Sequence, residues 1–346
     1  MEIDETYDVM KDYAEYSLLG HNTFGMDAKC RRFLEFASEA EASDVAQMLD
    51  WHNQDYIIIG AGSNLLLTKD FDGTVLHSAI KGISAIHGNG YVDVRCGSGE
   101  VWDEVVAHCV GNGWHGAENL SYIPGEVGAS AVQNIGAYGA EAKDLIVKVE
   151  AVGVEDGKPV VFDNDDCHYA YRDSIFKHEW KGRYIITYVT YRMSLDFNPH
   201  LDYGNVRSFL NEKGISSPTA AQLREAIIDI RKAKLPDPEV EGNAGSFFKN
   251  PIVLRSKYED LARLYPGMPH YIVGEDRVKI PAGWMIEQCG WKGKSLGRAG
   301  VHSKQALVLV NRGGASGSEV VDLYKKIASD VFSKFGIEIT PEVNVI

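Results

Sequence analysis

Short apolar runs alternate along the chain with longer segments in which apolar residues recur every three or four positions. The short runs predict β-strands and the periodic segments predict helices. Predicted strands cover residues 32–36, 56–59, 74–77, 92–96, 147–153, 184–193 and 306–311. Predicted helices start at Ser38 and Glu100 and cover residues 218–234, 256–264, 281–289 and 319–335. Because both element types are spread along the chain, the pattern indicates an α+β fold.

Two of the predicted helices carry recognisable start signals. Ser38 with Glu41, and Thr219 with Gln222, have the spacing of a capping box, in which each side chain bonds backbone N–H groups at the helix start. Pro236 predicts the end of the second of these helices, since a proline disfavours helical backbone in the residue before it. Residues 1–17, in contrast, are polar and acidic and predict a loosely attached tail.

A glycine-rich turn, Gly60-Ala-Gly-Ser-Asn64, follows the strand at 56–59. It does not fit the dinucleotide-binding fingerprint of Rossmann folds, because Leu65 stands where the third glycine belongs and a strand is predicted next. Consecutive N–H groups in such a strand–turn–strand can form an anion nest of the kind that diphosphates require. From this motif alone, a plain tight turn is an equally good interpretation.

A second segment rich in glycine and small residues runs from Tyr122 to Gly139. Without a Cβ, glycine lets the backbone approach a flat ring or a phosphate closely. Close packing of a helix on a sheet would explain the same composition. Together with the first turn, the segment indicates a large dinucleotide that spans two lobes.

Three residues have both a chemical and a structural interpretation. Arg172 lies among aromatic residues, where a buried guanidinium needs an anion, either a substrate or a protein partner such as Asp173. Ser246 is not in a Gly-x-Ser-x-Gly motif and by itself resembles an ordinary turn serine. Glu342, near the end of the chain, would by itself be taken for a surface carboxylate.

Composition excludes several classes of protein. The 346 residues are 45% hydrophobic and 24% charged, which is ordinary for a folded globular chain. The net charge of −14 disfavours a general nucleic-acid binder, which needs a basic face. An anionic small substrate remains compatible with this charge, provided that a few placed cations and backbone N–H groups meet it.

The cysteines and the N-terminus indicate the compartment. Five scattered cysteines without a CxxC pair predict reduced thiols in a cytoplasm. The acidic N-terminal residues lack the apolar core of a secretory signal, and no apolar run approaches membrane-spanning length. Eleven histidines include no HExxH motif or paired ligand spacing. We therefore expect a cytoplasmic protein without a metal, nucleic-acid or membrane partner.

Eight motifs in order are far more specific together than singly. They are Asn22-Thr-Phe-Gly25, Gly60-Ala-Gly-Ser-Asn64, Ile123-Pro-Gly125, Gln133-Asn-Ile-Gly-Ala-Tyr-Gly139, Tyr171-Arg-Asp-Ser174, Gly242-Asn-Ala-Gly-Ser-Phe-Phe-Lys-Asn-Pro251, Ala282-Gly-Trp284 and Pro341-Glu-Val343. With these motifs the chain, from about Ser17 to its end, resembles the UDP-N-acetylenolpyruvoylglucosamine reductase (UDP-N-acetylmuramate dehydrogenase) family. Tyr203 and the segment up to Tyr271 resemble its larger subclass, in which a tyrosine loop closes over the substrate.

The resemblance implies a fold and a division into domains. The fold is the FAD-binding fold of the vanillyl-alcohol-oxidase (PCMH) type in two lobes, with a C-terminal α+β substrate-binding domain. The implied parts are an N-terminal tail (1–17), FAD-binding lobes at 18–82 and 83–233 with the PCMH-type region at about 23–194, a substrate-binding domain (234–336) and a C-terminal strand (337–346) that returns to the active site.

The resemblance also implies an NADPH-dependent oxidoreductase of peptidoglycan precursor synthesis, a process tied to cell-wall biogenesis, cell shape and cell division. In this family NADPH reduces FAD, and the reduced flavin sends hydride from N5 to the terminal enolpyruvyl carbon of UDP-N-acetylglucosamine enolpyruvate, giving UDP-N-acetylmuramate. By the resemblance, Ser246 gives a proton to the α carbon, and Arg172 and Glu342 stabilise the enolate. No histidine or cysteine occupies a motif position suited to covalent attachment, so non-covalent FAD is expected.

Further site residues follow from the same resemblance. The substrate site would contain Tyr171, Tyr203, Lys234, Asn250, Tyr271 and Gln305, with Lys234 and Tyr203 at the UDP phosphates. The cofactor site would contain Asn22, Thr23, Gly60, Ala61, Gly62, Ser63, Asn64, Leu65, Tyr122, Ile123, Pro124, Gly125, Gly128, Ala129, Gln133, Asn134, Gly136, Ala137, Tyr138 and Gly139.

Two other functions compete with this one. A sugar or alcohol oxidase on the same flavin fold would pass electrons to O₂ and could dispense with Ser246, Arg172 and Glu342. A non-catalytic nucleotide- or flavin-binding module would not turn over at all, and the presence of the full trio argues against it. We expect the chain to act as a monomer.

Overall fold

The computed structural model describes residues 10–346, so residues 1–9 of the predicted tail lie outside the described residues. The chain divides into two compact units. The first contains residues up to Tyr16, Cys30–Ala61 and Phe71–Ala233, and the second contains Ser17–Lys29, Gly62–Asp70 and Lys234–Ile346. None of the described helices is both long and apolar enough to cross a membrane.

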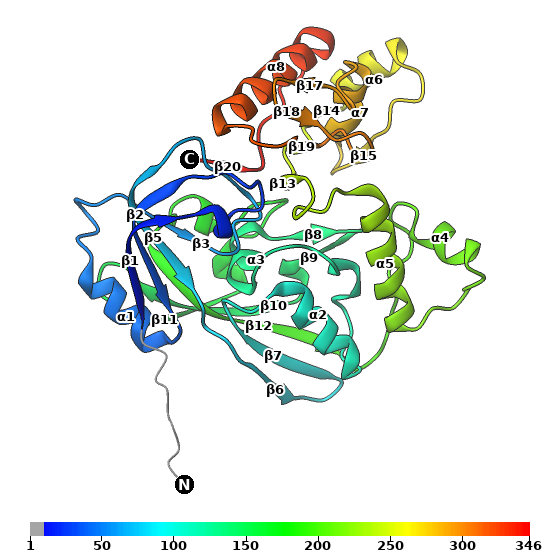
Figure 1. Cartoon of the computed structure of the whole chain (residues 1–346). Coiled ribbons are helices and arrows are strands. Elements are labelled where there is room, and N and C mark those ends of the chain that lie inside the picture. Colours follow the sequence, from blue (N-terminus) through cyan, green and yellow to red (C-terminus); the bar gives the residue numbers. More distant parts are fainter. Residues whose placement is uncertain (1–9) are drawn as a thin grey trace. The chain divides into compact units, whose positions relative to one another are not determined.

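The first unit is built on two sheets that differ in strand direction (Figure 1). One has the order β1 (Lys11–Ser17), β2 (Lys29–Phe36), β5 (Phe71–Ser78) and β3 (Tyr56–Ile59), and in it β5 runs parallel to both β2 and β3. The other is antiparallel, with the order β11 (Pro159–Asp163), β10 (Ile146–Gly153), β12 (Tyr184–Ser194), β7 (Tyr91–Gly97) and β6 (Ile83–His87).

The helices of the first unit are α1 (Glu39–Met48), α2 (Trp102–Gly111), α3 (Val127–Gln133), α4 (Val206–Glu212) and α5 (Ala220–Lys234). The buried residues of α4 and α5 pack together in a cluster of their own. A short hairpin of β8 (Gly136–Ala137) and β9 (Ala140–Glu141) follows α3. The helix α1 contacts β10 and β12, while α3 contacts β12 and β7, so the antiparallel sheet contacts both helices.

The second unit contains three smaller groups of strands. One antiparallel sheet has the order β13 (Gly242–Ser246), β19 (Val308–Asn311), β18 (Ala299–Val301) and β17 (Ser295–Leu296), and another has β14 (Ile252–Leu254), β16 (Arg277–Lys279) and β15 (Tyr271–Ile272). The strand β20 (Asn344–Val345) runs parallel to β4 (Leu65–Leu66). The helices are α6 (Arg255–Leu264), α7 (Ala282–Gln288) and α8 (Gly317–Phe335), of which α8 contacts the β17–β19 strands.

The capping box predicted at Thr219 is present, and only half of the one predicted at Ser38 is formed. At α5, the Thr219 hydroxyl accepts from the Gln222 N–H at 3.2 Å and the Gln222 side chain accepts from the Thr219 N–H at 2.9 Å. At α1, the Ser38 hydroxyl accepts from the Glu41 N–H at 3.1 Å, but the Glu41 carboxylate accepts from the Ala37 N–H at 2.7 Å. The sequence signals therefore place both helix starts correctly.

The prediction of a tail is wrong for residues 11–17, which form the edge strand β1. Arg32 of β2 donates to both carboxylate oxygens of Asp12 at 2.9 and 2.7 Å. The ring of Tyr16 stacks on that of Phe33 with 4.4 Å between centroids. Polar residues that seemed to indicate a loose segment are therefore paired with charges of the neighbouring strand.

The segment 122–139, for which no helix was predicted, contains the helix α3. A Cβ on Gly128 of this helix would lie 3.0 Å from the Cβ of Ser98, tighter than ordinary contact. This glycine therefore serves close packing of the helix, the alternative that the composition left open. The turn at 60–64 joins β3 to β4, as the strand–turn–strand prediction requires.

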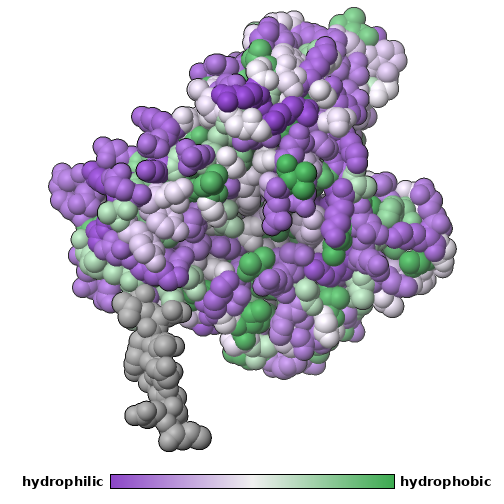
Figure 2. All heavy atoms as spheres, viewed as in Figure 1, coloured by the Kyte–Doolittle hydropathy of each residue, from purple (hydrophilic) through white to green (hydrophobic). Residues whose placement is uncertain are grey.

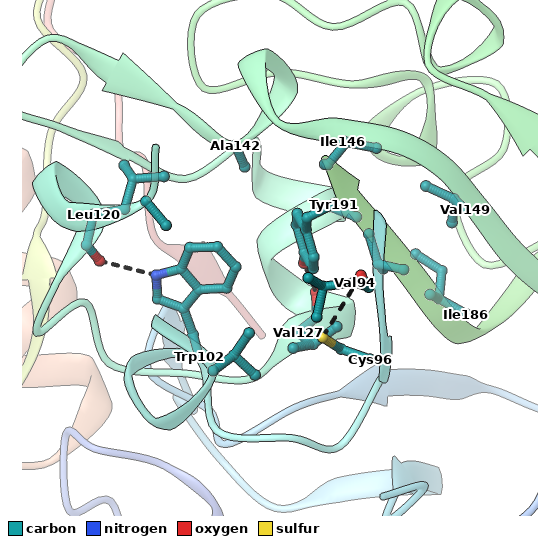
Figure 3. Close-up of a cluster of buried hydrophobic side chains, with 14 of the residues drawn as sticks. Val94, Cys96, Trp102, Leu120, Val127, Ala142, Ile146, Val149, Ile186 and Tyr191 are labelled. Carbon is teal, nitrogen blue, oxygen red and sulfur yellow. Dashed lines mark hydrogen bonds between the residues drawn. The ribbon is translucent and has the colours of Figure 1, made fainter. Parts of the chain in front are cut away.

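A buried aromatic pair occupies the core between α2 and the antiparallel sheet. Trp102 and Tyr191 are 1% and 0% exposed, and their rings meet edge to face at 5.2 Å (Figure 3). The indole N–H donates to the Leu120 carbonyl at 2.9 Å, and the Tyr191 hydroxyl lies 2.6 Å from that of Ser130 on α3. Both polar atoms are thus satisfied inside an apolar cluster.

Hydrophilic residues cover most of the face seen in Figure 2, and hydrophobic residues occur there in small separate groups. Charged residues make up 24% of the chain, which is enough to supply such a hydrophilic surface.

Replacing Trp102 by alanine should lower the free energy of unfolding by about 3–5 kcal/mol, since a large buried ring leaves a cavity and an unsatisfied carbonyl. Urea unfolding, monitored by circular dichroism, measures this free energy of unfolding. The control Val161→Thr, at a side chain that is 56% exposed, should change stability by less than about 0.5 kcal/mol. A loss below about 1 kcal/mol for Trp102→Ala would contradict the assigned core.

Candidate active site

Strained backbone marks the predicted site residues of the first unit. Among the described residues, six non-glycine residues have φ in the left-handed region. Four of them are predicted site residues: Tyr122 (59°), Asn134 (45°), Tyr138 (46°) and Arg172 (54°). Such conformations cost on the order of 1–3 kcal/mol each and concentrate at functional sites, where surrounding contacts enforce them.

Side chains bind both the backbone N–H and the backbone carbonyl of Tyr122. Its N–H donates to a carboxylate oxygen of Asp103, and its carbonyl accepts from Nε of Arg231 at 3.0 Å. Arg224 in turn donates to both oxygens of Asp103 at 2.7 and 2.9 Å. These bonds fix the left-handed turn at the start of the Gly-rich segment.

The pKa values of Asp103 and Arg231 are both lowered, but by different causes. Burial alone would raise the pKa of Asp103, but hydrogen bonds from Arg224 and the Tyr122 N–H outweigh burial and lower it. Burial lowers the pKa of Arg231, and the nearby Arg172 guanidinium acts in the same direction. The positive charges of Arg172 and Arg231 are therefore close enough to repel each other.

Two predicted cofactor residues use their side chains inside the protein. The buried Asn134 amide donates to Glu141 at 3.0 Å and to the Ala170 carbonyl at 2.8 Å, and its oxygen accepts from the Lys143 N–H at 3.0 Å. In the second unit, the Asn22 side chain makes three bonds of the same kind to backbone groups. Both asparagines therefore shape their loops, and only their backbone groups remain to face a cofactor.

Arg172 lies at the tip of a tight turn closed by backbone bonds between Ala170 and Asp173 at 3.1 and 3.0 Å. Its guanidinium donates to the carbonyls of Gly136 and Asn134. The carboxylate of Asp173 contacts His178 at 2.8 Å. The structure thus joins Arg172 to the Gly-rich segment, and Asp173 turns to a different partner.

Glycines on the predicted cofactor loops fill places where no side chain fits. A Cβ on Gly62, whose φ is +64°, would lie 2.0 Å from the His21 carbonyl oxygen. A Cβ on Gly60 would lie 2.9 Å from the Glu126 carboxylate, and one on Gly139 would lie 3.2 Å from Cβ of Tyr203. Loops with bare, tightly held backbone suit a nucleotide cofactor, because a phosphate or a flat ring can approach them closely.

The second unit brings Ser246 and Glu342 onto neighbouring backbone. Ser246 is exposed at the end of β13, just before the buried Phe247. The Phe247 carbonyl accepts from the Glu342 N–H at 2.7 Å, and Asn64 Nδ2 donates to the Glu342 carbonyl at 3.3 Å. Thr23 completes this arrangement, since its hydroxyl donates to the Asn243 carbonyl at 2.6 Å. Four separate motifs therefore meet in this unit.

Asn250 and Gln305 meet at the start of α7. The Asn250 oxygen accepts from the Ala282 N–H at 2.9 Å, and the Gln305 oxygen lies 3.3 Å from the place of a Cβ on Gly283. The structure therefore brings together two predicted substrate residues and the motif that begins at Ala282.

The other predicted substrate residues lie apart along the chain. Tyr203 packs beside Gly139 in the first unit. Lys234 is the last residue of α5, and Tyr271 begins β15 with Lys279 above its ring at 5.6 Å. Tyr171 is the neighbour of Arg172 at the tip of its turn, with the guanidinium 5.4 Å from its ring centre.

Sequence reasoning missed Asp103, Arg224 and Arg231, which position Tyr122. Arg224 and Arg231 lie one helical repeat apart on α5, so the spacing of seven could have suggested a common face. Nothing in the sequence pairs that face with Asp103 on α2, because the contact spans more than a hundred residues.

Asp103→Asn should destabilise the protein by about 1.5–3 kcal/mol at pH 7, since it removes a charge that accepts from Arg224 and Tyr122. The folded pKa of Asp103 is below its ordinary 3.8, so its contribution is present above pH 3.8 and is lost as the pH falls below that value. The stability difference between wild type and variant, from urea unfolding, should therefore shrink in that acidic range. Asp229→Asn, which breaks an exposed pair with Lys213, should cost less than about 1 kcal/mol. A constant difference at every pH would contradict the charged role of Asp103.

Comparisons with known proteins show what each part of the chain is similar to. A family model described as FAD binding domain matches residues 31–163, and one described as UDP-N-acetylenolpyruvoylglucosamine reductase, C-terminal domain, matches residues 237–346. The UDP-N-acetylenolpyruvoylglucosamine reductase of Bacteroides fragilis is 54% identical over 96% of this chain and 99% of its own. That of Flavobacterium johnsoniae is 44% identical over 97% of this chain and 100% of its own.

A solved structure has the same fold. The crystal structure of the UDP-N-acetylenolpyruvylglucosamine reductase from Thermus caldophilus superposes with a TM-score of 0.66 at 21% identity, covering 97% of this chain and 98% of that one. The prediction of an α+β fold with an FAD-binding domain is thus confirmed. The identities of 54% and 44% over nearly full lengths show that the chain belongs to the UDP-N-acetylenolpyruvoylglucosamine reductase family.

Proposed function

We propose that this chain reduces the enolpyruvyl ether of UDP-N-acetylglucosamine enolpyruvate to UDP-N-acetylmuramate, with Ser246, Arg172 and Glu342 as its catalytic residues. Family membership supplies the overall reaction. The observation that best supports the assigned roles is the bond between the Glu342 N–H and the Phe247 carbonyl, which sets Glu342 beside the strand that ends at Ser246.

When bound and reduced by NADPH, FAD would supply the hydride for the terminal carbon of the enolpyruvyl group. Backbone of the turn Gly60–Leu65 and of the segment Tyr122–Gly139 would hold it, since side chains are sterically excluded at Gly62 and restricted at Gly60 and Gly139. Histidine or cysteine tethers are not needed for this mode of binding, so the flavin should dissociate on denaturation.

Arg172 is suited to the carboxylate of the enolpyruvyl group. Addition of hydride to the terminal carbon leaves negative charge on the α carbon and, by resonance, on the carboxylate. A guanidinium presents two parallel donors to such a group and stays charged throughout. Backbone carbonyls of Asn134 and Gly136 accept hydrogen bonds from Arg172 within the first unit, so little reorganisation of the guanidinium is needed when the charge develops.

Ser246 is suited to give the proton that completes the reduction. Its hydroxyl is exposed at the end of β13, next to two buried phenylalanines that fix the backbone. A serine hydroxyl is a weak acid, but the α carbanion is a strong base, so the transfer is favourable. Glu342, on the adjoining segment, would donate a hydrogen bond to the substrate carboxylate when its carboxyl group is neutral.

We place the reaction in the cytoplasm. All five cysteines are free, and four of them are buried. Burial raises the pKa of Cys30 to about 11 and that of Cys109 to about 12, so these thiols stay protonated and act as core residues. Free thiols without disulfides are typical of a reducing compartment.

A single assay tests the proposed function: oxidation of NADPH with and without UDP-N-acetylglucosamine enolpyruvate. Oxidation that depends on this substrate and yields UDP-N-acetylmuramate supports the proposal. Steady oxidation with peroxide formation that the substrate does not affect would overturn it.

Ser246→Ala should leave reduction of FAD by NADPH nearly unchanged and slow turnover with the enolpyruvyl substrate by about 10²–10⁴-fold, the usual worth of general acid catalysis. Stopped-flow absorbance of the flavin separates the two half-reactions. Ser256→Ala, at an exposed serine on α6, serves as the control and should leave both rates unchanged. If Ser246→Ala slows both half-reactions equally, the serine is structural.

Lys234→Ala should raise the KM for the UDP substrate more than the KM for NADPH, because a lysine at the end of α5 offers a point charge to a diphosphate. Rising salt should weaken substrate binding by the wild type and change it less in the variant, since exposed charge pairs are screened. Lys213→Ala, on the surface pair with Asp229, is the matched control. Equal effects of Lys234→Ala on both KM values would show that the lysine does not bind the UDP group.

A further inference from the structure

A row of four side chains with alternating charge crosses the first unit and has no role in the mechanism described so far. Lys11 of β1 donates to Glu35 of β2 at 2.6 Å. Nδ1 of His77 on β5 lies 2.9 Å from the other oxygen of Glu35, and Nε2 lies 3.2 Å from the carboxylate of Glu126. The imidazole therefore bridges two carboxylates that come from different elements.

The fold fixes each member of this row. The parallel register of β2 and β5 sets Glu35 directly opposite His77, and Ile59 of β3 lies opposite His77 on the other side. Glu126 is the residue before α3 begins. The side chains of Glu35, His77 and Glu126 are only 16%, 12% and 12% exposed. Glu35 and Glu126 both contact the imidazole, and Lys11 contacts Glu35.

Glu126 connects this row to both predicted cofactor loops of the first unit. It belongs to the Gly-rich segment 122–139, between Gly125 and α3. One of its oxygens lies 2.9 Å from where a Cβ on Gly60 would stand. Gly60 follows Ile59 directly and opens the other loop. Movement of the Glu126 carboxylate therefore disturbs the contact between the two loops.

The protonation state of His77 decides whether the bridge can persist. An imidazolium donates from both ring nitrogens, whereas a neutral imidazole has one N–H and can donate to only one of the two carboxylates. Burial alone lowers the pKa of His77, but hydrogen bonds and charge from Glu126 and then Glu35 outweigh burial and raise it. After deprotonation one mostly buried carboxylate would lack its donor, which is costly in a partly desolvated place.

We propose that His77 is a positioning residue which, through Glu126, holds the two predicted cofactor loops together, so that the affinity for FAD falls when the imidazole loses its proton. This inference rests on the proposed use of these loops for FAD. Below the raised pKa of His77 the bridge is complete and FAD is held tightly. As the pH rises through that value, the imidazole loses the charge that attracts Glu126 and keeps one N–H for two carboxylates, so the packing of the segment 122–139 beside Gly60 loosens.

The test measures the dissociation constant of FAD between pH 6 and 9 at constant ionic strength, from the free flavin absorbance after ultrafiltration of the purified holoenzyme. For the wild type, the constant should rise by about tenfold or more across this range, the lower end of what one hydrogen bond to a charged group contributes. His77→Gln and Glu126→Gln should each weaken FAD binding by about tenfold or more at pH 6 and show a flat profile. Glu126→Gln keeps the experiment decisive if His77→Gln does not fold.

The matched control is His115→Gln, because His115 forms a comparable pair with the buried Glu118 at 3.1 Å. It should keep the wild-type pH profile. A wild type that binds FAD with the same affinity from pH 6 to 9 would overturn the inference, as would His77→Gln that retains the pH slope and loses only thermal stability. Failure of the wild type to bind FAD at any pH would overturn the proposed function itself, which distinguishes the two results.

Discussion

Hydrogen bonds from side chains to the backbone of segment 122–139 are the interaction on which the first unit depends. Asp103 accepts the N–H of Tyr122, and Asn119 donates to the carbonyl of Tyr138 at 2.9 Å. These bonds offset the cost of left-handed backbone at positions that are not glycine. The buried Trp102 precedes Asp103 on α2, so packing of the hydrophobic core also sets the position of a carboxylate that holds the loop. A change in the packing of the core around Trp102 would therefore also shift the backbone of the segment 122–139.

In the second unit, backbone hydrogen bonds hold the C-terminal segment that carries Glu342. A carboxylate so near a terminus would ordinarily be on a fraying segment, yet Glu342 is enclosed by backbone bonds. Its own N–H binds Phe247, and two residues later the Asn344 N–H donates to the Asn64 carbonyl at 3.0 Å. The final residue, Ile346, donates to the Leu66 carbonyl at 2.9 Å. The short strand β20 thus gives Glu342 the rigidity that a site residue needs.

Local signals were sufficient for six of the eight α-helices in the described residues and for the longer strands, but not for most of the short strands or wherever a distant partner decides the structure. The capping residues Ser38 and Thr219 act within one turn, so the sequence alone places those helix starts. The strand β1 depends on Arg32, twenty residues from its partner Asp12, and polarity alone therefore predicted a tail. Motif resemblance supplied the site residues, but it could not show that the asparagine side chains of Asn22 and Asn134 are used internally. That distinction requires the three-dimensional contacts of each amide.

The guanidinium charges close to the Gly-rich segment differ in sign from the net charge of the chain. A net charge of −14 acts at long range, and physiological salt screens it within about 8 Å. Close to the Gly-rich segment the relevant charges are guanidinium groups, and Arg231 is sufficiently buried that its pKa falls. Arg224 has a carboxylate partner in Asp103, whereas Arg231 binds a neutral carbonyl and feels the charge of Arg172. Asp103 also acts electrostatically on Arg231, so the positive charge of that guanidinium is partly compensated. The local field beside the Gly-rich segment is therefore set by these few placed charges and differs from what the net charge of the chain suggests.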